Sequence, residues 1–288
     1  MAGGGQELKR RIRTVRNTQQ ITRAMKLVAG AKLRRAQERA ERSRAYFDTI
    51  QDVLQRAVAA SGSGTLRHPL FRSPSGPNAA YLVVTSDRGL AGPFNSNVIR
   101  AASQLMREHG RASVVFAVGR KARDAFRRRG TPMAGEFVGI GDDPHYYQAK
   151  AIADALIGAY LAGEVSSVHM VYAHFLNAMV QRPTAVQLLP MTPPELPASG
   201  SQTTPYVFEP DAEAVLADLV PRYVEVLVYG ALLESKASEH GARMTAMDAA
   251  TKNSEDLLKH LTLTSNRLRQ AAITNEIAEL VGGAAALE

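Results

Sequence analysis

The sequence predicts an α/β protein in which long N- and C-terminal helices pair as an antiparallel two-helix coiled coil around an inserted Rossmann-like α/β domain. All 14 prolines lie between Pro69 and Pro221, which leaves most of both ends free to form uninterrupted helices. Both ends also space their apolar residues by alternating steps of three and four, and the middle alternates apolar runs with helical stretches. We expect an N-terminal helix over residues 1–60, a globular domain over residues 61–209 and a C-terminal helix over residues 210–288.

The N-terminal segment has the spacing of a coiled-coil helix. Its only glycine between residues 6 and 60 is Gly30, and one glycine costs a helix about 1 kcal/mol relative to alanine. The residues that alternate by four and three are Ala36, Ala40, Ser43, Phe47, Ile50, Leu54 and Ala57. They share one face of the helix, so we expect this face to contact a partner helix.

The C-terminal segment repeats the pattern over about seven heptads, more than the three or four that support a coiled-coil prediction. Its seam consists of Tyr223, Val226, Gly230, Leu233, Ala237, His240, Met244, Met247, Thr251, Ser254, Leu258, Leu261, Ser265, Leu268 and Ala272. Many of these side chains are small, which lets two backbones approach closely. Residues 1–60 carry a net charge of +9 and residues 210–288 carry −5, so the two helices are expected to lie against each other.

The middle of the chain has the pattern of a mostly parallel sheet. Apolar, β-branched runs predict strands over residues 80–85, 113–118 and 168–172, and helical stretches cover residues 97–109, 121–129 and 147–161. Strands that alternate with helices of 10 to 15 residues imply βαβ units. Residues 190–205 hold five prolines together with serine and threonine, and we interpret them as a linker back to the coiled coil.

Composition limits the possible functions. The chain has 288 residues, a net charge of +8 and no cysteine, which excludes a disulfide scaffold, a cysteine nucleophile and a thiolate metal site. It has no run of 18 apolar residues and no signal-peptide core near its start, so we expect a soluble intracellular protein. The positive charge favours an anionic partner, and a basic coiled-coil nucleic-acid-binding protein is the alternative interpretation. The first 60 residues contain only Tyr46 and Phe47 as aromatics, which weakens that alternative because base stacking needs aromatic side chains.

No motif in the sequence predicts chemistry. Neither a Gly-x-x-x-x-Gly-Lys-Ser/Thr loop nor a Gly-x-Gly-x-x-Gly turn is present. The nearest candidate is the segment SDRGL at residues 86–90, after the first predicted strand, where Arg88 could hold an anion. We favour a polar strand-to-helix turn there. His169 and His174 are an odd number of residues apart on one strand and face opposite sides, so shared metal coordination is not expected. We predict no catalytic, cofactor-binding or metal-ligating residue and no cofactor.

Both ends resemble one known family. Residues 12–29 (IRTVRNTQQITRAMKLVA) and 31–36 (AKLRRA) are similar to the N-terminal helix of the γ subunit of F-type ATP synthase. Residues 234–253 (ESKASEHGARMTAMDAATKN), 269–279 (RQAAITNEIAE) and 282–287 (GGAAAL) resemble its C-terminal helix. The central segments SDRGL and GRKA, at residues 86–90 and 119–122, also fit this family.

The resemblance implies a central shaft of the ATP synthase. In that family the coiled coil enters a ring of α and β subunits, and the α/β domain sits with the ε subunit on the membrane c-ring. The resemblance therefore implies a non-catalytic rotor subunit at the cytoplasmic face of a bacterial plasma membrane, without a nucleic-acid partner. It implies β-subunit contacts at Met25, Arg269, Gln270, Thr274 and Glu276. Our hypothesis for contact with an acidic loop of β is Lys26, Lys32, Arg34 and Arg35.

Overall fold

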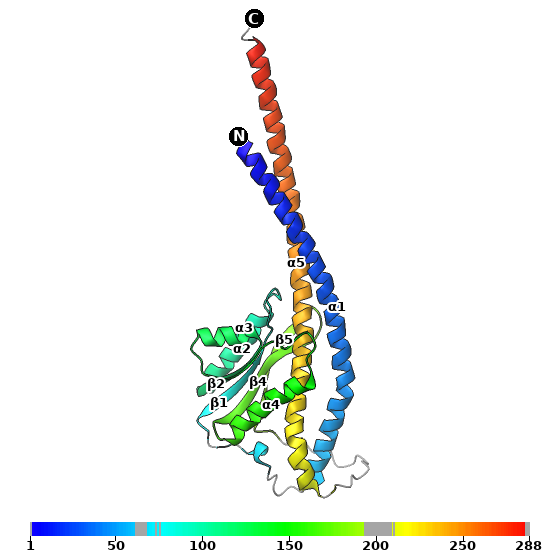
Figure 1. Cartoon of the computed structure of the whole chain (residues 1–288), viewed down its shortest axis with the longest axis vertical. Helices are drawn as coiled ribbons and strands as arrows, with labels where there is room; N and C mark the ends of the chain where they lie inside the picture. Colours follow the sequence, from blue (N-terminus) through cyan, green and yellow to red (C-terminus); the bar gives the residue numbers. More distant parts are fainter. Residues whose placement is uncertain are drawn as a thin grey trace. The chain divides into compact units, whose positions relative to one another are not determined.

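The computed structural model describes residues 2–60, 68–72, 74, 76–192, 209 and 211–285 (Figure 1). Most of the predicted linker over residues 190–205 lies outside this part of the chain. The chain folds into two compact units. We call residues 1–28 with 244–288 the two-helix unit and residues 29–243 the sheet unit.

Two long helices confirm the prediction from the heptad pattern. Helix α1 runs from Ala2 to Ala60 and helix α5 from Ala212 to Ala285. Neither helix combines the length and the apolar character needed to cross a bilayer, as far as the chain is described.

In the two-helix unit, α1 and α5 run antiparallel. Lys26 Nζ lies 2.6 Å from Asp248 Oδ1, and Thr251 Oγ1 lies 2.9 Å from Thr22 Oγ1, so lower numbers on one helix face higher numbers on the other. The predicted seam positions Thr251, Ser254, Leu258, Leu261 and Ser265 are less exposed than their neighbours. The last two predicted positions, Leu268 and Ala272, are exposed.

The sheet unit contains a five-stranded sheet in the order β3-β2-β1-β4-β5. The strands are β1 (Asn78–Val84), β2 (Ala112–Val118), β3 (Met133–Phe137), β4 (Val165–Phe175) and β5 (Gln181–Leu189). Strands β1 to β4 are parallel and β5 pairs antiparallel with β4. The predicted strands correspond to β1, β2 and β4. The prediction missed β3, which is short and contains Gly135, and β5, whose polar sequence contains Pro183 and forms an edge of the sheet.

Helices cover both faces of this sheet (Figure 1). Helices α2 (Phe94–His109), α3 (Arg120–Arg128) and α4 (Tyr146–Leu161) agree with the three predicted ones within three residues at each end. Ala79, Tyr81 and Val83 of β1 pack with α2 and α3, whereas Ala80 and Leu82 pack with α4, α5 and the end of α1. This alternation explains why β1 is apolar at every position that the sheet buries.

Helix α5 contains Pro221, the last proline of the chain, inside its first turns. The helix begins at Ala212 and continues through Pro221. A proline lacks the N–H that would bond to the carbonyl four residues earlier, here that of Ala217. The His68 imidazole, which accepts a hydrogen bond from the Leu70 N–H, is hydrogen-bonded to the Ala217 carbonyl instead. The missing donor is therefore replaced by a side chain from the 3-10 turn η1 region (Pro69–Phe71).

A buried carboxylate ties α4 to α5. Glu225 is 5% exposed and accepts hydrogen bonds from the Tyr146 hydroxyl at 2.6 Å and from Lys150 Nζ at 3.0 Å. Burial, together with this carboxylate, raises the pKa of Tyr146. The pair of donors satisfies a charge that would otherwise be costly inside the protein.

Candidate functional site

The carboxyl edge of the sheet is where α/β proteins usually bind ligands, and here it is occupied by the chain itself. Asp87 follows β1 and accepts hydrogen bonds from the backbone N–H groups of Arg120 and Gly139, both at 3.0 Å. Arg120 is the first residue of α3, so the Asp87 carboxylate takes the place at this helix N-terminus where an external anion would bind.

The residues around Asp87 are fixed by further local hydrogen bonds. The Thr85 hydroxyl donates to the Val118 carbonyl and accepts from the Ala122 N–H, while the Ser86 hydroxyl donates to the Arg88 carbonyl at 2.6 Å. Gly119 has a φ of +84°, and a Cβ there would collide with the Thr85 carbonyl oxygen. The prediction of a polar strand-to-helix turn therefore agrees with this geometry.

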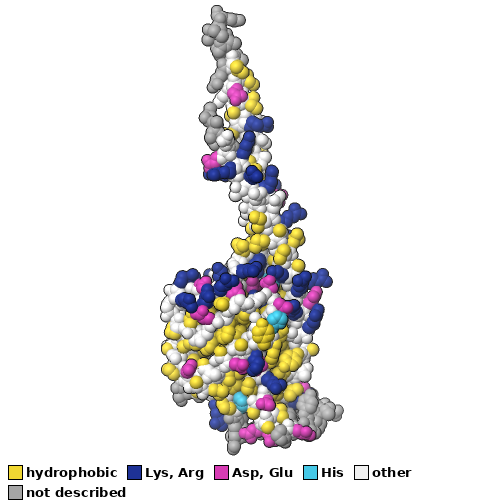
Figure 2. Space-filling model, viewed as in Figure 1, with side chains coloured by type: hydrophobic (Ala, Val, Ile, Leu, Met, Phe, Trp, Pro, Cys, Tyr) yellow, Lys and Arg dark blue, Asp and Glu magenta, His cyan; other side chains and the backbone are white. Residues whose placement is uncertain are grey.

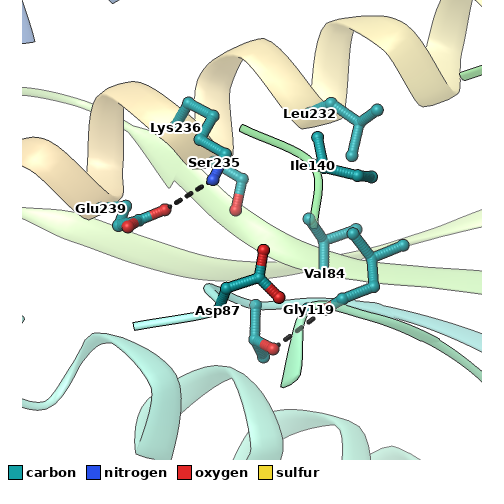
Figure 3. Close-up of a pocket in the computed structure, with 10 residues that line it drawn as sticks. Val84, Asp87, Gly119, Ile140, Leu232, Ser235, Lys236 and Glu239 are labelled. Atoms are coloured by element: carbon teal, nitrogen blue, oxygen red, sulfur yellow. Dashed lines mark hydrogen bonds and ion pairs between the residues drawn. The ribbon is translucent and has the colours of Figure 1, made fainter. Parts of the chain in front are cut away.

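The pocket beside this turn is very small (Figure 3). Its volume is about 10 Å³, enough for roughly one water molecule. Lys236 and Glu239 of α5 line it and form an ion pair of 3.0 Å with each other. No nucleotide fits in this space, and the exposed Arg88 has no role in lining it.

His169 and His174, which the sequence analysis compared as metal ligands, contact different helices. His169 of β4 lies against His109 at the end of α2, with ring centroids 4.5 Å apart, and burial lowers the pKa of His169 to about 4. His174 points the other way and lies 2.6 Å from Glu234 of α5. Across the described ranges, no three histidine, aspartate or glutamate side chains gather as metal ligands do.

The four basic residues predicted to meet an acidic loop fall into two pairs. Lys26 and Lys32 already form ion pairs inside the chain, Lys26 with Asp248 and Lys32 with Asp142 of the loop before α4, both at 2.6 Å. Arg34 and Arg35 are exposed. Arg34 forms an ion pair with Glu38, one turn further along α1.

A partly exposed ionic cluster around Asp142 was not predicted from the sequence. Asp142 accepts from Lys32 of α1 and lies 3.5 Å from the Nε2 of His240, a residue of α5 that is 1% exposed. Asp143 forms an ion pair with Arg39 of α1. Burial alone would raise the pKa of Asp142, but the Lys32 hydrogen bond and the nearby positive charges lower it. The only sequence signals were the Asp142–Asp143 pair and the Lys32 to Arg39 spacing of two helical turns.

The residues expected to contact a β subunit lie on the two-helix unit. Met25 is half-buried beside the seam, and Arg269, Gln270, Thr274 and Glu276 are all exposed on α5. The Thr274 hydroxyl donates to the Gln270 carbonyl at 2.9 Å, one turn earlier. This exposed set is open to a partner protein, and its contact with a β subunit stays a prediction.

Together these features define a class: an antiparallel coiled-coil protein with an inserted α/β domain whose usual ligand edge is closed by its own side chains. Residues 4–287 match the family model described as ATP synthase. The chain belongs to the ATP synthase gamma chain family. It is 51% identical to the ATP synthase gamma chain of Pelotomaculum thermopropionicum and 52% identical to that of Desulforamulus reducens, over 98% of each chain.

Solved structures agree with this assignment. A chain of the Tetrahymena thermophila mitochondrial ATP synthase central stalk and c-ring is 27% identical, with a TM-score of 0.61 over 80% of this chain and 99% of that one. A chain of the Euglena gracilis mitochondrial ATP synthase has a TM-score of 0.71 at 17% identity, over 100% and 95% of the two chains, and shows the shared fold. None of these comparisons supports the nucleic-acid-binding alternative.

Proposed function

We propose that this chain is the central-stalk rotor subunit of an F-type ATP synthase. It would transmit ion-driven rotation of the membrane c-ring to the catalytic β subunits, which change conformation as they make or hydrolyse ATP. The observation that carries the proposal is the family match over residues 4–287, on a fold made of two long antiparallel helices and an inserted sheet.

In this proposal the chain is not an enzyme on its own. Nucleotide chemistry belongs to the β subunits, and the closed pocket of about 10 Å³ at the carboxyl edge of the sheet supports this division. The partners are the ring of three α and three β subunits, the ε subunit and the membrane c-ring. The complex would place this subunit peripherally at the cytoplasmic face of a bacterial plasma membrane.

The exposed residues of α5 suit a contact that forms and breaks as a rotor turns. Arg269, Gln270, Thr274 and Glu276 offer charged and amide groups at the helix surface, and burial does not hold them in one conformation. Such side chains can bond to a β subunit in one orientation and to water in the next, at little net cost. We assign Met25 to the same β contact, as an apolar side chain beside the seam.

The contact with an acidic β loop is best carried by Arg34 and Arg35, which are exposed on α1. Lys26 and Lys32 already have carboxylate partners inside the chain, so they would share their charge with the loop. Guanidinium groups bind carboxylates in a bidentate manner, which suits this role.

Reconstitution tests the proposal. Adding the purified chain to isolated α and β subunits should yield a complex whose ATPase activity is lost when the chain is omitted. Equal ATPase activity with and without the chain would contradict the rotor function.

A second pair of variants tests the acidic-loop contact separately. R34E/R35E should fold normally but lower coupled ATP synthesis in the assembled complex. K26E/K32E should also lower the stability of the isolated chain, because it breaks two internal ion pairs. Unchanged ATP synthesis with R34E/R35E would contradict the proposed loop contact but not the rotor function.

A further inference from the structure

Within residues 61–209, the positive charge is concentrated on two helices. Residues 96–131, which include most of α2 and all of α3, hold nine basic and two acidic side chains, a net charge of +7. The rest of residues 61–209 holds five basic and eight acidic side chains. Figure 2 shows Lys and Arg side chains gathered along the edge of the globular part where α3 lies. A domain that is nearly neutral as a whole therefore has one strongly basic surface.

Internal ion pairs neutralise only part of this charge. Three arginines pair with carboxylates within the sheet unit: Arg120 with Asp87, Arg123 with Asp124, and Arg127 with Glu136. The other six cations form no ion pair with a carboxylate within the described residues: Arg100, Arg107, Arg111, Lys121, Arg128 and Arg129. Exposed like charges at this density repel one another, so an anionic partner would be stabilised here.

The basic surface surrounds an apolar groove between α2 and α3 of about 670 Å³. Its floor contains Ile99 and Met106, two helical turns apart on α2, and the buried ring of Phe126 from α3. Arg100 and Arg107 follow these two residues, again two turns apart, and form the rim. The groove thus has an apolar strip bordered by positive charge.

Arg129 orders the far side of the groove. Its guanidinium donates to the Ser103 hydroxyl of α2 and lies 5.6 Å from the Phe126 ring centroid. It therefore bridges α3 to α2 without a carboxylate. The stripe from Ser96 to Arg107 extends about 16 Å along the helix axis, the length of three helical turns.

We propose that this groove, which we call the α2–α3 groove, binds an acidic amphipathic helix of a partner protein. The apolar face of that helix lies on Met106 and Ala125, the partly exposed apolar residues of the groove, and its carboxylates pair with Arg100 and Arg107. Contacts seven residues apart, or two helical turns, are one of the spacings of helix-in-groove binding. Bidentate guanidinium pairing fits carboxylates.

Two other anionic partners fit this surface less well. Single-stranded nucleic acids stack their bases on exposed aromatic side chains, and the aromatic ring that lines the groove, that of Phe126, is 1% exposed. A lipid surface binds convex or flat basic faces with protruding apolar anchors, whereas here the apolar residues form the floor. The proposal goes beyond the rotor function and does not depend on it.

The test measures binding of a synthetic peptide to the purified full-length chain. The probe is a fluorescein-labelled helical peptide of about 18 residues, with leucines on one face and glutamates on the other. Fluorescence anisotropy at physiological ionic strength should show saturable binding. Binding should weaken about tenfold for R100E/R107E, which corresponds to about 1.4 kcal/mol. It should weaken at least threefold for Met106→Gln, which keeps the charge and changes only the apolar floor.

The matched control is R42E/R44E, which makes the same charge change at two exposed arginines of α1. It should leave the affinity unchanged, and a peptide of the same composition with its leucines scattered around the helix should bind at least fivefold more weakly. Three results would overturn the proposal: no saturable binding, equal weakening by the control variant, or tighter binding of duplex DNA or phosphatidylglycerol vesicles with the same dependence on Arg100 and Arg107. Circular dichroism confirms that each variant is folded.

Discussion

The Nε2 atom of the buried His240 lies 3.5 Å from Oδ1 of the half-exposed Asp142, although the two residues are almost one hundred positions apart in the chain. Arg243 Nη1, which can only donate, lies 3.4 Å from His240 Nδ1. The Nδ1 atom is therefore the acceptor, and the imidazole proton resides on Nε2, facing Asp142. This pair joins α5 to the loop that also binds α1 through Lys32.

The first prediction concerns the pH dependence of stability. Burial lowers the pKa of His240, while Glu239 and Asp142 oppose the shift and Arg243 and Lys236 add to it. Because the folded pKa lies below the usual 6.5, the contribution of His240 is complete above about pH 6.5 and is lost as the pH falls below it. Urea unfolding should show a smaller loss of stability between pH 7.5 and pH 5 for His240→Gln than for the unmodified chain.

Other histidines also contribute to the pH dependence of stability, so the experiment needs a control variant. His68 and His169 have lowered pKa values as well, so some pH dependence should remain in His240→Gln. His145→Gln, at an exposed position before α4, should leave the profile unchanged. An identical profile for His240→Gln and the unmodified chain would show that the imidazole is not held neutral by its surroundings.

The second prediction concerns Asp87. Its side chain is 13% exposed and accepts from two backbone N–H groups at the carboxyl edge of the sheet. Asp87→Ala should lower the free energy of unfolding by about 2–4 kcal/mol, because two charge-assisted hydrogen bonds to backbone N–H groups are lost. The adjacent Arg88→Ala should change it by no more than about 0.5 kcal/mol. Denaturant titration compares the two, and similar values would contradict the role given to Asp87.

The third prediction compares two glycines with positive φ. Gly119 has a φ of +84° and lies against the Thr85 carbonyl, whereas Gly110 has a φ of +60° with open space around it. Gly110→Ala should cost about 1 kcal/mol, the penalty of the left-handed conformation alone. Gly119→Ala adds a steric clash and should cost more than about 3 kcal/mol. Thermal unfolding of both variants measures the difference, and equal melting temperatures would contradict the close approach.

The fourth prediction separates an ion pair between elements from one within a helix. Lys32 and Asp142 join α1 to the loop before α4, and Arg34 and Glu38 lie one turn apart on α1. A double-mutant cycle with alanine at both positions should give a coupling free energy of about 1 kcal/mol for the first pair. The second pair should give about 0.3 kcal/mol. A larger value for Arg34 and Glu38 would show that the Asp142 cluster contributes little.

Local patterns in the sequence predicted the elements that they encode directly. Steps of three and four residues identified α1 and α5, because a helical stripe is a local property of the chain. Apolar runs identified β1, β2 and β4, which the sheet buries on both faces. They missed β5, because an edge strand with Pro183 is defined by its pairing with β4 and not by its own composition.

The tertiary structure decided which charges meet. The sequence by itself determined that α1 is basic and that α5 opposes it, but not that Lys26 and Lys32 would have partners inside the chain while Arg34 and Arg35 stay exposed. The sequence also shows that α2 and α3 are rich in basic residues. That these residues surround one groove depends on how the two helices pack on the sheet. Electrostatic interactions follow distance in space, and only folding brings residues such as Asp142 and His240 close enough for their charges to matter.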